Sequence, residues 1–139
     1  MSKPFIIEGK LKVDDRGVVS FINDFKFDTV KRRYLVKNHG IGFIRAWHGH
    51  MKEGKFVTVI NGAALIGTVS LTTDEISKYV LCDCDPKVLY IPPGYANGFK
   101  TLLNDTIIEF FSTSTLEESL GDDIRYPWDK WNIWEEDYR

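Results

Sequence analysis

Short apolar runs alternate with turn-forming residues along almost the whole chain. The runs are rich in valine, isoleucine, phenylalanine and tyrosine, and glycine, proline, asparagine or aspartate separates one run from the next. This pattern is typical of β-strands joined by tight turns. We predict strands at residues 5–13, 18–22, 29–37, 41–50, 55–60, 63–71, 79–82, 87–91, 99–103 and 106–112. About ten short strands with almost no helix predict an all-β sandwich or barrel.

Two of the turns predict hairpins. Asn61-Gly62 is a favoured two-residue hairpin turn, so we expect strand 63–71 to pair with strand 55–60. Asn104-Asp105 predicts a second hairpin, in which strand 99–103 pairs with strand 106–112.

The pattern changes after residue 114. The segment 115–119 predicts a capped helical turn that begins at Thr115. Trp128, Trp131 and Trp134 follow at helical spacing, and we expect them to pack the tail onto the sheet rather than bind a ligand. Because the chain has no repeat, linker or low-complexity segment, we predict that residues 1–139 form a single domain.

Composition and charge narrow the class of protein. The net charge of −2 leaves no basic excess to neutralise phosphates, which argues against nucleic-acid binding. No apolar stretch reaches the ~20 residues of a membrane span, and the first residues carry no signal-peptide hydrophobic region. We therefore expect no membrane association and a cytoplasmic location. Cys82 and Cys84 would face opposite sides of a strand, so we expect free thiols in a reducing compartment.

The stretch 44–50 (Ile-Arg-Ala-Trp-His-Gly-His) holds two of the three histidines. As a strand, its period of two would place four residues on one face: Ile44, Ala46, His48 and His50. Imidazoles titrate near neutral pH and also ligate metals. The pair therefore indicates either proton-transfer chemistry or half of a metal site.

The spacing around this stretch resembles the first cupin motif, in which a glycine, a His-x-His pair, a glutamate and a second glycine recur at set intervals. The corresponding series here is Gly42, His48, His50, Lys55 and Gly62. The segment 92–97 (Pro-Pro-Gly-Tyr-Ala-Asn) resembles the second motif, Pro-x-Gly-x-x-His. The resemblance implies a cupin-type jelly roll, also called a double-stranded β-helix.

Two departures from the cupin motifs decide against a metal. Lys55 stands at the position of the third ligand, and Asn97 stands at that of the fourth. Divalent ions prefer imidazole and carboxylate ligands, and an ammonium group would repel them. We predict a site without metal or cofactor, in which His48, His50, Lys55 and Arg45 act on an anionic substrate or intermediate.

Segments along nearly the full length resemble the dTDP-4-dehydrorhamnose 3,5-epimerase family of sugar-nucleotide cupins. They are Asp15-Arg16-Gly17, Asn38 with Ile44-Arg45-Ala46-Trp47-His48, Glu53-Gly54-Lys55-Phe56 with Val59-Ile60-Asn61-Gly62, the run 91–99 (Ile-Pro-Pro-Gly-Tyr-Ala-Asn-Gly-Phe) and Gly121-Asp122-Asp123-Ile124-Arg125-Tyr126.

This resemblance implies roles for individual residues. His48 falls where the family has its catalytic base, and Lys55 falls where a lysine stabilises the enolate oxygen of the sugar. Arg16 and Arg45 fall at positions that contact the nucleotide phosphates or the sugar. We take His50 as a further catalytic candidate. Asn38, Tyr95 and Asn97 lie in the matching segments and are candidate substrate-binding residues.

Other positions depart from the family. Phe110 stands where the family has a tyrosine that acts as general acid, and Tyr90 or Tyr95 could replace it. The carboxylate that orients the base histidine has no clear counterpart. Three aspartates could serve: Asp123, Asp129 or Asp137.

We therefore expect a metal-independent epimerase that acts on a dTDP-linked 4-keto-6-deoxyhexose in deoxysugar biosynthesis for a surface polysaccharide. The alternative is a sugar-nucleotide 3,4-ketoisomerase, because those small cupins also carry His-x-His and a tail similar to segment 123–129. A non-catalytic sugar-binding cupin is a third hypothesis. The family resemblance also implies a homodimer with exchanged N-terminal strands.

Overall fold

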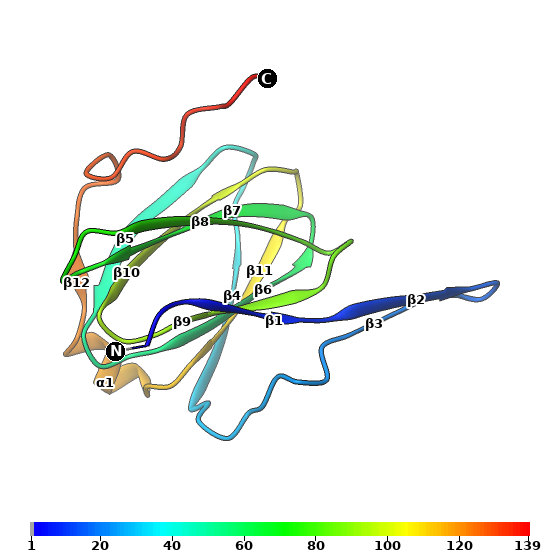
Figure 1. The fold of residues 1–139 in the computed structure, drawn as a ribbon, viewed down its shortest axis with the longest axis horizontal. Coiled ribbons are helices and arrows are strands. Elements are labelled where there is room, and N and C mark those ends of the chain that lie inside the picture. The colour runs from blue at the N-terminus through cyan, green and yellow to red at the C-terminus, as the bar shows by residue number, and fades with distance from the viewer. Residues whose placement is uncertain (1) are drawn as a thin grey trace.

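Two five-stranded antiparallel sheets pack face to face in the computed structural model, which describes residues 2–139 (Figure 1). In order across the first sheet, the strands are β1 (Phe5–Glu8), β9 (Lys87–Ile91), β6 (Lys55–Asn61), β11 (Ile107–Ser112) and β4 (Arg32–Lys37). In order across the second, they are β12 (Ile124–Arg125), β5 (Ile44–His50), β10 (Tyr95–Thr101), β7 (Ala63–Ser70) and β8 (Ile76–Cys82). This arrangement confirms the predicted all-β jelly roll.

A hairpin of β2 (Lys10–Asp14) and β3 (Gly17–Phe21) projects away from both sheets (Figure 1). The strand predicted at 5–13 is therefore two strands, which Gly9 separates. The N–H of Gly9 donates to the carbonyl of Pro86, and a Cβ at this position would lie 2.5 Å from the carbonyl oxygen of Phe21. Glycine thus permits the close approach of three chain segments where the hairpin leaves the sheet.

The main core lies between the sheets and follows from the alternation of side chains along each strand. Every second residue of the central strands points inward and is apolar. The buried members of this core are Val57, Val59, Ala64, Ile66, Leu81, Leu89, Ile91, Phe99, Ile108 and Phe110. Charged side chains join this interior where His48 and Lys55 lie, and that region forms the site described below.

Both predicted hairpins are wrong, although the turns are present. β6 pairs with β9 and β11, whereas β7 pairs with β8 and β10, so Asn61-Gly62 carries the chain from one sheet to the other. β10 and β11 likewise belong to different sheets. Gly62 has a φ of +88°, which favours glycine at this crossing. A turn residue marks where a strand ends but does not determine which strand it pairs with.

A one-residue bulge interrupts β5. His48 lies opposite Asn97 of β10, and Arg45 lies opposite Phe99. Residues 46–47 together therefore face the single residue between those two partners. An extra residue of this kind changes the phase of the alternation within a strand.

Because of the bulge, the side chains of β5 do not lie on the faces predicted from a regular alternation. Arg45 and His48 both line the interior, and the His50 side chain is also buried. Ile44 and Ala46 instead pack in a separate apolar cluster. The prediction that all four residues of the period-two series share a face is therefore wrong for Ile44 and Ala46.

The C-terminal segment behaves largely as predicted. Helix α1 (Leu116–Leu120) begins after the N-cap Thr115, whose hydroxyl accepts from the N–H of Glu118 in a capping box. The tail packs onto the second sheet through Trp131 and Trp134, whose rings contact Trp47. The packing prediction is wrong for the Trp128 side chain, because Trp128 is 50% exposed. In the part of the chain that the structure describes, no helix is long and apolar enough to cross a membrane.

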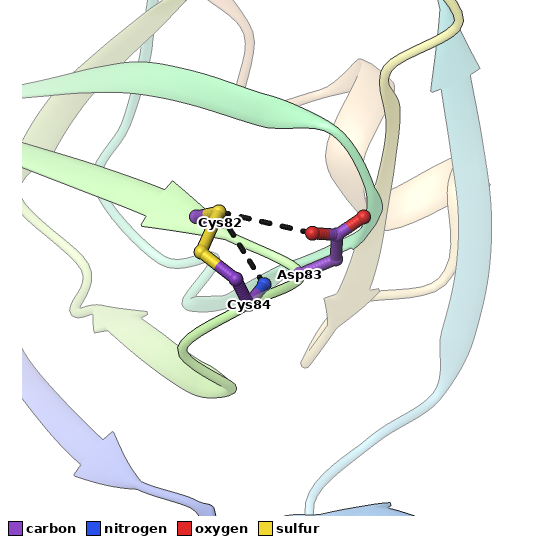
Figure 2. Close-up of side chains that lie close together, drawn as sticks. All are labelled: Cys82, Asp83 and Cys84. Atoms are coloured by element: carbon purple, nitrogen blue, oxygen red, sulfur yellow. Dashed lines mark hydrogen bonds between the residues drawn. A yellow bond between two sulfur atoms is a disulfide. The ribbon is translucent and has the colours of Figure 1, made fainter. Parts of the chain in front are cut away.

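Cys82 and Cys84 form a disulfide, so the expectation of free thiols is wrong (Figure 2). Cys82 ends β8 and the chain turns at Asp83, which brings the second sulfur back beside the first instead of placing it on the opposite face. The Asp83 carboxylate accepts from the N–H of Gly62 at 2.9 Å and fixes the turn. These three side chains are the one group of three potential metal ligands within residues 2–139, but the sulfurs are bonded to each other.

Candidate active site

The candidate active site lies between the sheets, where polar residues replace the apolar core. A cavity of about 160 Å³ opens there. The second sheet contributes His48 from β5, and the first contributes Lys55 from β6. The lining residues are Tyr34, Val36, Arg45, His48, Lys55, Phe99 and Phe110. The structure therefore brings together three of the predicted site residues.

His48 is half-buried, and a carboxylate lies beside it. Its Nδ1 is 3.8 Å from Oδ1 of Asp123, whose other oxygen accepts from Nε of Arg125 at 2.9 Å. Burial lowers the pKa of His48, the positive charges of Lys55 and Arg125 lower it further, and Asp123 opposes them. The imidazole is therefore neutral at neutral pH, as a general base must be.

Asp123 is the candidate carboxylate that the structure places beside His48. Of the three aspartates considered from the sequence, it is the one whose carboxylate lies within 4 Å of the His48 imidazole. Asp137 instead pairs with Arg139 in the tail. Asp123 reaches His48 because β12 pairs with β5, where Arg125 lies opposite His48.

His50 is buried, and its ring orientation is fixed. Its Nδ1 lies 2.9 Å from the carbonyl oxygen of Asp122. A carbonyl can only accept, so Nδ1 carries the proton and Nε2 has the free lone pair. Burial, followed by the charge of Lys55, lowers the pKa of His50. His50 is therefore a second neutral imidazole on the strand that carries His48.

Lys55 is a buried cation whose ammonium lies against aromatic rings. Its Nζ is 5.9 Å from the ring centroids of both Tyr34 and Phe110, within range of a cation–π contact. Its nearest carboxylate is that of Glu53, at 4.0 Å. Burial lowers the pKa of Lys55, and Glu53 opposes that shift.

Tyr34 is a site residue that the sequence interpretation missed. It lies opposite Phe110 in the pairing of β4 with β11, and the two rings stack with centroids 4.8 Å apart. Burial and the charge of Glu53 raise the pKa of Tyr34, so its hydroxyl stays protonated. The alternation along 29–37 places Tyr34 on one face of the strand with Val36, but only the register places it beside Phe110. Tyr90 faces away from this cavity and packs on Phe5 and Phe56.

The predicted substrate-binding residues divide into three groups. Arg45 and Asn38 lie together at the cavity edge, where Nε of Arg45 donates to Oδ1 of Asn38 at 2.7 Å. Asn97 is buried and donates to the backbone carbonyl of His48 at 3.3 Å, and Tyr95 is half-buried against the core. Arg16 does not line this cavity: it lies at the turn between β2 and β3, in the hairpin that projects away from both sheets (Figure 1), and pairs with the aspartate two residues before it.

A jelly roll that places two histidines and a lysine between its sheets defines a cupin-type protein. The sequence profile of the dTDP-4-dehydrorhamnose 3,5-epimerase family matches residues 1–134, and the chain belongs to this family. The family predicted from the sequence is thus confirmed.

Individual relatives agree with this assignment. The spore coat polysaccharide biosynthesis protein SpsL of Bacillus subtilis (strain 168) is 29% identical over 107 residues, which cover 70% of this chain and 71% of SpsL. The dTDP-4-dehydrorhamnose 3,5-epimerase of Bacillus anthracis, solved with TDP and pyrophosphate, has a TM-score of 0.80 at 22% identity, covering 94% of this chain and 84% of that one.

A second structural neighbour is an enzyme with the alternative activity, 3,4-ketoisomerisation. A mutant 3,4-ketoisomerase of Thermoanaerobacterium thermosaccharolyticum was solved in complex with TDP-4-keto-6-deoxyglucose. Its TM-score is 0.74 at 22% identity, and the match covers 91% of this chain and 89% of the ketoisomerase. At these identities the structural likeness establishes the fold, which both activities share.

Titration of His48 by nuclear magnetic resonance tests the direction in which its surroundings shift its pKa. We expect a pKa below 6.5, because burial and two nearby cations disfavour the imidazolium. Asp123→Asn removes the opposing carboxylate, so the pKa should fall further. Asp129→Asn changes a carboxylate that forms no ion pair with His48 and should leave the titration unchanged. A native pKa at or above 6.5 would contradict this description.

Proposed function

We propose that the protein is a metal-independent epimerase that removes a proton next to the C4 ketone of a dTDP-linked 4-keto-6-deoxyhexose. One observation carries this proposal: a neutral imidazole and a buried ammonium, His48 and Lys55, line the same small cavity. An imidazole can take the proton, and the enolate that develops needs a cation close by. Membership of the epimerase family supports the same reaction.

The placement of acid and base on opposite sheets fits inversion of a carbon centre. His48 takes the proton from C3. The electron pair of that C–H bond forms a C3–C4 double bond, and the π electrons of the C4 carbonyl move onto its oxygen. Lys55 stabilises the resulting enolate. Tyr34 projects from the first sheet while His48 projects from the second, so a substrate between them meets a proton donor on the other face. Transfer of the Tyr34 hydroxyl proton to C3 on that opposite face re-forms the ketone with inverted configuration, while His48 keeps the proton it removed until solvent exchange resets both groups.

The 3,4-ketoisomerase is the alternative, and His50 is the observation that favours it. His50 projects from the same strand as His48 and keeps a defined tautomer through the Asp122 carbonyl. Such an imidazole could move a proton to C4 on the face from which C3 lost one. The ketone would then move from C4 to C3, with no proton delivered from the opposite sheet.

Incubation with TDP-4-keto-6-deoxyglucose in deuterium oxide tests the reaction. We expect deuterium at C3 or C5 while the C4 ketone is retained, because enolate formation exchanges those protons with solvent. His48→Asn should slow exchange by about 10²–10⁴-fold, the usual contribution of a general base. Mass spectrometry and proton spectra measure both results.

Other outcomes of this incubation discriminate between the hypotheses. A 3-keto product would establish the ketoisomerase. Binding without any exchange would establish a non-catalytic sugar-binding cupin. Full exchange by His48→Asn would show that another residue is the base.

Tyr34→Phe tests the proton donor. The variant keeps the ring stacked on Phe110 but removes the hydroxyl, so kcat for inversion should fall by about 10²-fold or more. KM should change little, and exchange from the His48 side should continue. Tyr90→Phe, on the outer face of the sheet, is the matched control and should retain full activity. Normal inversion by Tyr34→Phe would exclude Tyr34 as the donor.

We further propose a homodimer in which the hairpin of one chain brings Arg16 to the site of its partner. The Arg16 side chain is 85% exposed at the hairpin turn. Three apolar residues of the same hairpin are also largely exposed: Val13, Val18 and Val19. A projecting apolar hairpin requires a covering surface, and a second copy of the chain supplies one.

Mixing two inactive variants tests this exchange. Arg16→Ala and His48→Asn chains are each expected to be nearly inactive alone. If Arg16 acts across the interface, random reassortment restores about a quarter of native activity, because half the dimers are mixed and each has one intact site. If Arg16 acts within its own chain, mixing restores nothing.

We propose that the product enters synthesis of a surface polysaccharide. The relative SpsL, which is named for spore coat polysaccharide biosynthesis, supports this assignment. The cytoplasmic location stays a prediction. The Cys82–Cys84 disulfide argues against this location, because disulfides are rare in reducing compartments.

A further inference from the structure

Glu53 is a buried carboxylate beneath the candidate active site, and the proposed mechanism has not used it. Its side chain is 0% exposed. Oε2 accepts from the hydroxyl of Ser112 at 2.9 Å and lies 3.5 Å from Nη2 of Arg32 and 4.0 Å from Nζ of Lys55. Oε1 lies 3.8 Å from Nδ1 of His50 and has no hydrogen-bond partner within residues 2–139.

The position of Glu53 is built into the fold. The carboxylate of Asp122 accepts from the backbone N–H groups of residues 51, 52 and 53 at 2.9, 2.8 and 3.0 Å. These bonds fix the turn between β5 and β6, from which Glu53 points into the interior. Burying a carboxylate is unfavourable unless cations and hydrogen-bond donors compensate. A turn held this firmly, with a buried carboxyl group inside it, indicates a role beyond packing.

We propose that Glu53 is a positioning residue that keeps the Lys55 ammonium charged and held at the cavity, where it stabilises the enolate oxygen. Glu53 acts through Lys55 and does not touch the substrate. This inference rests on the proposed function for the role of the enolate, but the effect of Glu53 on Lys55 can be measured without any substrate.

The balance of charge around Lys55 explains why it needs this partner. Burial lowers the pKa of Lys55, and the Arg32 guanidinium lowers it further. Glu53 and, more weakly, Asp123 oppose these effects. The titratable or charged groups that face Lys55 are Arg32 and Tyr34 from β4, His48 and His50 from β5, Glu53 from the turn and Asp123 beside β12.

Without Glu53, the half-buried Arg32 and the buried Lys55, which both lie within 4.0 Å of the same Glu53 oxygen, would have only the weaker effect of Asp123 to offset their charges. Lys55 can lose its proton, whereas arginine remains charged at any pH that a protein tolerates. Lys55 would therefore deprotonate at a lower pH and cease to stabilise an enolate. A purely structural Glu53 would instead bind Arg32 and Ser112 and leave the ionisation of Lys55 unchanged.

The test is Glu53→Gln, which keeps the size of the side chain and its bond from Ser112. With lysines labelled with ¹³C at Cε, carbon and proton shifts follow the titration of Lys55, whose signal is assigned by its loss in Lys55→Arg. We expect the Lys55 pKa to fall by about one to two pH units, the usual effect of an opposite charge at this distance. The alkaline limb of the kcat profile should move down by the same amount, with KM little changed.

Glu109→Gln is the matched control. Glu109 also lies on the first sheet, in an ion pair with Arg33 at 2.6 Å, but its side chain faces away from the cavity. This variant should leave both the Lys55 titration and the pH profile unchanged. An unchanged Lys55 pKa in folded Glu53→Gln would overturn the proposal.

A second variant keeps the test decisive if Glu53→Gln does not fold. Arg32→Gln removes the cation that repels Lys55 and leaves Lys55 as the one cationic partner of Glu53 Oε2 in this cluster, so the Lys55 pKa should rise. A fall or no change would overturn the proposal. Absence of deuterium exchange by the native protein would instead reject the proposed function, and the titrations would still decide whether Glu53 controls Lys55.

Discussion

The candidate site depends on the docking of residues 122–125 against β5 and the turn that follows it. The Asp122 carboxylate holds the backbone of that turn, and its carbonyl orients His50. The next residue, Asp123, lies beside His48. A few residues near the C-terminus therefore set the positions of both imidazoles and of the buried carboxylate. The two sheets provide the inward faces, and the packing of residues 122–125 positions the site residues on them.

Much of the fold could be predicted from the sequence because strand formation is a local property. The alternation of apolar and polar residues placed most strands to within a few residues, and β9 was predicted with its observed bounds. Pairing partners are not local, and both predicted hairpins were wrong for that reason. Asn61-Gly62 fits a hairpin and a crossing between sheets equally well. The Cys82–Cys84 disulfide was missed because strand geometry was applied to both cysteines, although Cys84 lies in the turn that follows β8.

The site was predictable where spacing carries the information. His48 and Lys55 emerged from the intervals of the cupin motif, and the structure places them in one cavity. Tyr34 could not be found in this way, because its importance comes from lying opposite Phe110 on a strand far away in the chain. Asp123 could only be one of three candidates until the pairing of β12 with β5 was known.

The bulge in β5 has a consequence for how much one strand can contribute. In a regular strand, residues three apart point to opposite sides. Arg45 and His48 are three apart, yet both line the cavity, because residues 46–47 share a single partner position. The same strand thus presents a guanidinium and an imidazole to one cavity. The bulge lets one strand place in the cavity two side chains that a regular strand would place on opposite faces.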